Sequence, residues 1–174
     1  YWVFKTAQSN KHTAPWQVRY AKAKGATKVA SLYVNNAYGE DGRDAIVEAA
    51  AAEGVEIVME ETFEAADTDM TAQLTKIKES GAEFIFTPQY YNEVALIVQQ
   101  AHELGWDAPI VGSDSWGSAE LMNLCGDDCK GLFFSTHYAA KGATGATKEF
   151  IDRYNEKHGY VPDDVGALTW DTML

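Results

Sequence analysis

The sequence predicts an α/β fold, a three-layer sandwich in which helices flank a mostly parallel central sheet. Two observations lead to this prediction. Short apolar runs alternate with longer amphipathic runs along most of the 174 residues. The amphipathic runs have the length of about 10 to 15 residues that is typical of helices linking parallel strands. Because parallel strands need crossover connections, we expect helices on both faces of the sheet.

Five apolar runs predict the strands. The first, VASLYV, is the near-continuous apolar kind that is buried on both faces of a parallel sheet. The predicted strands are residues 29–34, 55–63, 84–87, 109–112 and 131–136. Residues 1–4 (YWVF) resemble the middle of a further strand, and the chain begins with Tyr rather than Met. We therefore expect it to be a piece of a longer protein.

The amphipathic runs between and after these strands predict the helices. An alanine-rich helix should end at Gly54, which suits a left-handed C-cap. Asp69 is expected to cap the next helix, which should end at Gly81. The predicted helices are residues 41–53, 70–80, 92–104, 118–124 and 144–158, followed by a last helix that Asp164 caps.

Composition excludes several classes of function. The chain is 46% hydrophobic and 23% charged, as in a folded domain with a sizeable core. Its net charge of −12 repels phosphate backbones and anionic lipids, so we expect no nucleic-acid partner. No apolar run reaches the roughly 20 residues of a membrane span.

The two cysteines, Cys125 and Cys129, lie four residues apart in a Gly- and Asp-rich turn. A zinc site would need further Cys or His ligands nearby, and the sequence has none. The sequence is compatible both with two reduced thiols and with a short-loop disulfide. The disulfide is the favoured reading, and it would indicate an oxidising compartment.

Polar and aromatic side chains follow three of the predicted strands. Ligands of parallel α/β sheets bind beyond the carboxyl ends of the strands. Tyr38 follows the first strand, Tyr90 and Tyr91 follow the third, and Asp114 and Trp116 follow the fourth. One carboxylate among aromatic faces suits a ligand with an ammonium group and an apolar body. The alternative is that each residue only forms a turn or a solvated surface.

Catalytic and cofactor motifs are missing from the sequence. No GxGxxG or GxxxxGK[ST] follows a strand, and there is no GxSxG elbow. The first long strand ends in Asn35-Asn36 rather than in the acidic pair of a phosphoacceptor domain. The four histidines lack ligand spacing, although His137 follows a strand at the candidate edge. We therefore expect a binding protein without enzymatic activity, cofactor or metal.

Several stretches also match the motifs of a known family in order and spacing. They are Tyr38-Gly39, DMTAQLTKIKESG (69–81), YYNE (90–93), QAHELG (100–105), IVGSD (110–114), GLFFST (131–136) and FIDRYNEKHGYVPDDVGALTWD (150–171). From Phe4 to Asp171, the chain resembles the second lobe of the branched-chain amino acid ABC-transporter substrate-binding family, the Leu/Ile/Val type.

This resemblance implies a type I periplasmic binding protein fold, in which two α/β lobes close on a ligand. Residues 1–174 would then be one lobe, with 1–5 and 163–174 as segments that cross to the missing first lobe. The whole protein would be a periplasmic or cell-surface lipoprotein that captures an amino acid and delivers it to a membrane permease. The alternative is a ligand-sensing domain of a receptor or regulator with the same fold.

The resemblance also implies roles for individual residues. The acidic residue at the position of Asp114 holds the ligand's α-ammonium, and Tyr38 and Tyr90 match two tyrosines of the site. The ligand's carboxylate is held mainly by the first lobe. Two positions differ from the family: Lys5 stands where Arg is usual, and Asp114 is one methylene shorter than the Glu of some members. With Trp116 narrowing the pocket, the identity of the solute stays open.

Overall fold

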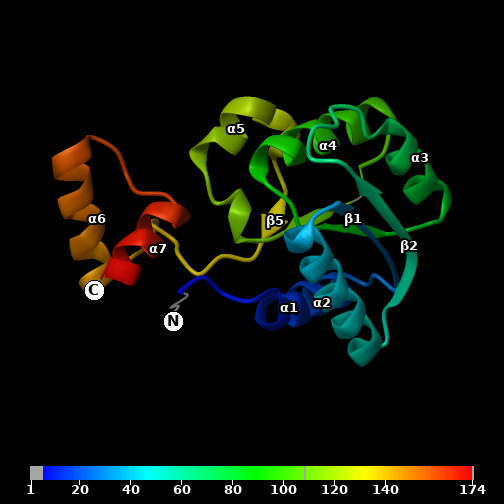
Figure 1. Ribbon diagram of the computed structural model, residues 1–174, viewed down its shortest axis with the longest axis horizontal. Helices are drawn as coiled ribbons and strands as arrows, with labels where there is room; N and C mark the ends of the chain where they lie inside the picture. The colour runs from blue at the N-terminus through cyan, green and yellow to red at the C-terminus, as the bar shows by residue number, and fades with distance from the viewer. Residues whose placement is uncertain (1–5, 108, 174) are drawn as a thin grey trace.

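The computed structural model describes residues 6–107 and 109–173. Its centre is a five-stranded, parallel sheet in the order β2-β1-β3-β4-β5 (Figure 1). The strands are β1 (Lys28–Val34), β2 (Glu56–Phe63), β3 (Phe84–Thr87), β4 (Ile110–Gly112) and β5 (Phe133–Phe134). This confirms the predicted α/β fold with a parallel sheet. The strand suggested for residues 1–4 lies outside the described residues.

The described chain also contains seven helices and two 3₁₀ turns, joined by loops. They are α1 (Asn10–Ala23), α2 (Ala37–Glu53), α3 (Thr71–Glu79), α4 (Tyr91–Glu103), η1 (Asp114–Trp116), α5 (Ala119–Cys125), η2 (Gly126–Cys129), α6 (Gly145–His158) and α7 (Asp164–Met173). The sequence did not predict α1. Pro15 lies inside this helix and removes one of its backbone donors, which hides the helical pattern.

Apolar side chains cover both faces of the sheet and form two cores. Alternate residues of a strand point to opposite faces. Phe84 and Phe86 therefore pack with α1 and α2, whereas Ile85 packs with α3, α4 and α5. Figure 1 shows α1 and α2 on one side of the sheet and α3 to α5 on the other. The predicted three layers are confirmed.

The helix after β1 begins four residues earlier than the sequence predicted. Asn36 is its N-cap, and its side-chain oxygen accepts hydrogen bonds from the backbone N–H groups of Tyr38 and Gly39, both at 3.0 Å. Gly39 fits tightly against the end of β1, because an added Cβ would lie 2.0 Å from the carbonyl oxygen of Val34. Tyr38 therefore lies in the first turn of α2, at a fixed position above the strand.

Two other predicted caps differ from the structure. At α3 the N-cap is Met70, so the prediction of Asp69 as the cap was wrong by one residue, although the side chain of Asp69 still accepts a hydrogen bond of 2.9 Å from the N–H of Thr71, the first residue of the helix. At α7, Asp163 rather than Asp164 accepts from the N–H of Gly166, at 2.8 Å. The prediction for Asp164 was wrong by one residue, and the side chain of Asp164 is buried instead.

Helices α6 and α7 lie beside the rest of the molecule, at the end of residues 135–144 (Figure 1). No residue of α6 is buried, and α7 exposes Val165 at 67%. The rings of Phe150 and Trp170 hold the two helices together, with centroids 5.3 Å apart. Near the other end of the chain, Thr6 shares a hydrogen bond of 2.7 Å with Thr172 of α7.

The sheet ends at β5, which is two residues long instead of the predicted six. Its outer side pairs with no other strand of the described chain. Phe133 is 45% exposed and Phe134 is 38% exposed. The sheet therefore has an apolar edge.

Candidate ligand site

Three strand ends place the candidate residues at the same edge of the sheet. β1, β3 and β4 are neighbours and parallel, so their carboxyl ends meet at this edge. Tyr38 lies in the turn after β1, Tyr90 is the N-cap of α4 after β3, and Asp114 opens η1 after β4. The fold thus brings together residues that are up to 76 positions apart in the sequence.

Hydroxyl groups connect the three strand ends. The hydroxyl of Tyr38 lies 2.6 Å from Oγ of Ser113 and 3.0 Å from Oγ of Ser115. Ser115 in turn donates a hydrogen bond of 2.5 Å to the carbonyl oxygen of Gln89, which also accepts from the indole N–H of Trp116 at 3.1 Å. These bonds fix the position of Tyr38 relative to the other two loops.

Tyr38 and Tyr90 stack on each other, with ring centroids 5.2 Å apart and an angle of 29° between the rings. Burial raises the pKa of Tyr38, the hydrogen bonds of Ser113 and Ser115 lower it, and the charge of Asp114 raises it. The net shift is upward, so Tyr38 stays a neutral hydrogen-bonding phenol. Tyr90 is 43% exposed and offers the open part of this aromatic surface.

Trp116 lies beneath this surface, in contrast to the expected position on its rim. Its side chain is 1% exposed and packs in the core on the α3 to α5 face. The indole covers Gly112 so closely that an added Cβ there would lie 2.0 Å from Cε2. Tyr91 is likewise half-buried and packs against that core. In this structure both residues support the loops from below.

Asp114 is the carboxylate at this edge, and its side chain is 25% exposed. Its partner among the described residues is His137, whose Nδ1 lies 3.6 Å from Oδ2 of Asp114. The site also contains three groups that were not predicted from the sequence: Ser113, Ser115 and the carbonyl of Gln89. The run Ser-Asp-Ser after β4 was a visible signal for the two serines.

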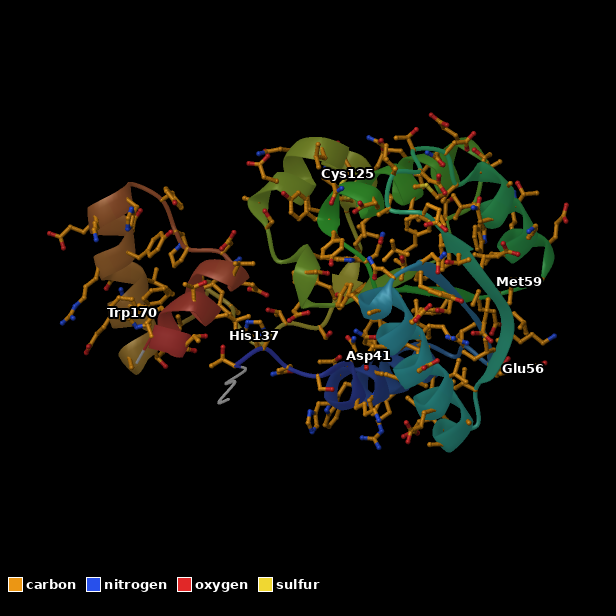
Figure 2. The ribbon with its side chains drawn as sticks, viewed as in Figure 1. Asp41, Glu56, Met59, Cys125, His137 and Trp170 are labelled. Atoms are coloured by element: carbon orange, nitrogen blue, oxygen red, sulfur yellow. A yellow bond between two sulfur atoms is a disulfide. The ribbon has the colours of Figure 1, made fainter. Side chains whose placement is uncertain are left out.

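The cysteines form the disulfide that the sequence favoured. Cys125 and Cys129 are joined with their Cα atoms 5.6 Å apart, and both are buried between the end of α5 and η2. The bridge lies away from the three strand ends, and Figure 2 labels Cys125 on α5. It therefore has a structural position rather than one in the candidate site.

No group of three or more His, Cys, Asp or Glu side chains among the described residues is arranged to hold a metal ion. None of the described helices combines the length and apolar character needed to cross a bilayer.

The sequence profile of a family described as "Periplasmic binding protein" matches residues 1–174. The chain belongs to this family. Membership agrees with the parallel sheet and with polar groups gathered at the carboxyl ends of its strands. The chain spans about half the length of the curated relatives that it matches.

Two curated relatives illustrate the likeness. The "Leucine-, isoleucine-, valine-, threonine-, and alanine-binding protein" of Pseudomonas aeruginosa is 25% identical over 157 residues, which are 90% of this chain and 42% of that protein. The "Leu/Ile/Val-binding protein homolog 3" of Brucella melitensis is 29% identical over 159 residues, again 90% and 42% of the two chains.

Two solved structures share the fold. The leucine binding protein LivK of Thermotoga maritima superimposes with a TM-score of 0.85 at 28% identity, over 93% of this chain and 47% of that one. The branched-chain amino acid transporter substrate binding protein LivJ of Streptococcus pneumoniae was solved in complex with isoleucine. It superimposes with a TM-score of 0.78 at 30% identity, over 94% of this chain and 47% of that one.

Proposed function

We propose that this chain is one half of a substrate-binding protein of an ABC transporter that captures an amino acid of the branched-chain class or a close analogue. One observation carries the proposal. A stacked pair of tyrosines, Tyr38 and Tyr90, lies at the same strand-end edge as the partly exposed carboxylate of Asp114. The names of the matched relatives support the same ligand class.

The chemistry of these groups suits an amino acid. The carboxylate of Asp114 pairs with the α-ammonium, and charge-assisted hydrogen bonds of this kind are roughly twice as strong as neutral ones. The rings of Tyr38 and Tyr90 attract the ammonium through their faces and also cover apolar side-chain atoms. Trp116 and Tyr91 hold the loops in place from below. When a second lobe closes over the ligand, the loss of water strengthens these contacts.

The missing half supplies the opposite wall in this proposal. It would hold the ligand's carboxylate, for which the Tyr38, Tyr90 and Asp114 surface offers no cation. It would also cover α6 and α7, whose exposed side includes Val165 and Trp170. The bond between Thr6 and Thr172 brings the two ends of the described chain together, as expected of segments that cross between lobes. Residues 1–5 and 163–174 would be such segments.

The proposed location is outside the cytoplasm, as a periplasmic protein or a cell-surface lipoprotein. Disulfides persist in oxidising compartments, so the Cys125–Cys129 bridge supports this location. A membrane permease would be the partner that receives the amino acid from the closed form.

The test is isothermal calorimetry on the full-length two-lobed protein with the twenty amino acids and common sugars and carboxylic acids. We expect micromolar or tighter binding of a branched-chain or similar amino acid. In Asp114→Asn the affinity should fall by about tenfold or more, because a charged contact is removed. Glu120→Gln, an exposed carboxylate on α5, is the matched control and should bind as the wild type does. Binding only of ligands without an ammonium would refute the role of Asp114.

A second test addresses the proposed arrangement of the lobes. Val165→Lys should leave the stability of the 174-residue chain unchanged, because this side chain is 67% exposed there. In the full-length protein the same substitution should lower the free energy of unfolding by about 1–3 kcal/mol, since the charge would enter an interface. Glu48→Lys on α2, an exposed side chain outside the α6–α7 pair, serves as the control. Equal effects of Val165→Lys in both proteins would contradict the arrangement.

A further inference from the structure

A histidine and two aspartates from distant parts of the chain meet behind the candidate site. Asp114 comes from η1, His137 from the segment that leaves β5, and Asp164 from the start of α7. Figure 2 shows His137 on the connection between the sheet and the α6–α7 pair. Nothing in the proposed role of Asp114 requires this histidine, so the cluster calls for a separate explanation.

The imidazole of His137 is enclosed but unpaired. Its side chain is 12% exposed, and both ring nitrogens are buried without a hydrogen-bond partner among the described residues. Its Nδ1 lies 3.6 Å from Oδ2 of Asp114, just beyond hydrogen-bond distance. A buried polar group without a partner costs free energy. A small shift of either side chain would turn this contact into a direct bond.

Asp164 is the third member of the cluster, and it contacts the residues next to His137 and the end of η1. Its carboxylate accepts a hydrogen bond of 2.6 Å from Oγ1 of Thr136, the residue before His137. An added Cβ on Gly117 would lie 2.4 Å from the carboxyl carbon of Asp164, so the end of η1 packs directly on this side chain. Burial raises the pKa of Asp164, whereas the bond from Thr136 and the charge of His137 lower it.

The surroundings of His137 are otherwise acidic. The ionisable groups around it are Asp114 of η1, Tyr138 beside it in the chain, Asp163 directly before α7, and Asp164 and Asp171 of α7. Within residues 6–107 and 109–173, no lysine or arginine forms an ion pair with any of these four aspartates. A proton on the imidazole would therefore meet carboxylates from two separate elements.

We propose that His137 competes with the ligand for Asp114 and that protonation decides the outcome. The proposal rests on the proposed function, because it assumes an ammonium ligand on Asp114. When the imidazole is neutral, the carboxylate of Asp114 is free to hold the ammonium. When the imidazole takes up a proton, it pairs with Asp114 and neutralises the charge that attracts the ligand. Histidine ordinarily changes its charge between about pH 5 and 8, so the affinity would fall in mildly acidic solution.

The sign of the effect follows from proton linkage. If the ligand binds the form with neutral His137, binding at low pH must release the proton of the imidazole. The dissociation constant then rises by up to about tenfold for each pH unit below the titration of the histidine. Above that titration it stays constant. An amino acid keeps its ammonium throughout this range, so the ligand itself contributes no such change.

The experiment measures binding of L-leucine and L-isoleucine to the full-length protein by calorimetry from about pH 5 to about pH 8. Two buffers with different ionisation enthalpies report the protons released. We expect wild type to weaken about tenfold or more at the acidic end and to release up to about one proton there. His137→Asn keeps a donor near the Nδ1 position but takes up no proton, so its affinity and proton count should not depend on pH.

Two further variants separate this role from a purely structural one. Asp164→Asn removes one of the carboxylates that stabilise the imidazolium, so the loss of affinity should move to lower pH. His102→Asn is the matched control, because His102 also contacts an aspartate, Asp128 at 3.2 Å, but far from the strand ends. It should retain the pH profile of the wild type.

Each outcome supports or overturns the proposal. Leucine or isoleucine binding that weakens in Asp114→Asn but is independent of pH in the wild type would overturn the role of His137 and leave the proposed function in place. A pH profile that His137→Asn retains would also overturn it. Failure of both amino acids to bind at any pH would overturn the proposal together with the branched-chain ligand class on which it rests.

Discussion

The contact between Gly112 and Trp116 gives a sharp test of how the strand ends are supported. In Gly112→Ala, the new methyl group would lie 2.0 Å from Cε2, 2.1 Å from Cζ2 and 2.7 Å from Cδ2 of the indole. Carbon atoms in contact prefer about 3.5–4.0 Å, so the ring must move by more than an ångström. Trp116 is 1% exposed and packs in the core on the α3 to α5 face, so a shift of the ring disturbs the packing around it.

The expected cost follows from two contributions. Overpacking of a well-filled core costs about 1–3 kcal/mol. A displaced indole also loses its hydrogen bond to the carbonyl of Gln89, which adds about 1 kcal/mol. A total of about 3 kcal/mol should lower the melting temperature of the 174-residue chain by about 6–12 °C. Differential scanning calorimetry and urea unfolding would measure both quantities.

Two companion variants isolate the steric cause. Gly166→Ala in α7 is the control, because its Cβ would lie 3.2 Å from Oδ1 of Asp163 and 3.4 Å from Cβ of Pro162, so the neighbouring atoms need to move by only a few tenths of an ångström. It should be neutral or stabilise by up to about 1 kcal/mol. Trp116→Phe leaves room for the methyl group, so the Gly112→Ala cost should shrink by about 1–2 kcal/mol in the double variant. Strict additivity, or a Gly112→Ala protein as stable as the wild type, would refute the packing argument.

Three further predictions concern the hydroxyl network, the disulfide and the buried aspartate. Tyr38→Phe leaves two serine hydroxyls without their shared partner, so it should cost about 1 kcal/mol in urea unfolding and weaken ligand binding. Replacing Cys125 and Cys129 by alanine opens a very short loop and should cost about 2 kcal/mol, with ligand affinity unchanged. Because burial raises the pKa of Asp164 in the folded state, ionisation opposes folding, and the wild type loses stability as pH rises from about 4 through the folded-state pKa. Asp164→Asn should therefore gain stability relative to the wild type across that rise, and a constant difference between pH 4 and 8 would contradict this.

The strands and the position of the site were accessible from sequence because they depend on local patterns. Apolar runs mark β1, β3 and β4, and the rule on carboxyl ends places Tyr38, Tyr90 and Asp114 at the same edge. The ligand class expected for such an edge came from the resemblance of the motifs to a known family. The start of α2 was missed because Asn36 was interpreted as part of a loop, although it caps the helix.

Features that depend on long-range packing were not accessible. The burial of Trp116 follows from the turn of η1, which directs the indole back over Gly112. The sequence places Asp164 27 positions after His137 and gives no sign that both meet Asp114. Helix α1 was hidden by Pro15, whose cost is offset by tertiary contacts on the sheet.

The open side of β5 has a consequence for any attempt to produce this half by itself. An unpaired strand edge offers free backbone donors and acceptors to another strand, and exposed phenylalanines add apolar surface that favours association. Phe133 and Phe134 would thus favour edge-to-edge association of separate copies, and the associated fraction would increase with protein concentration. A lysine in place of Phe133 would act as a gatekeeper against such aggregation.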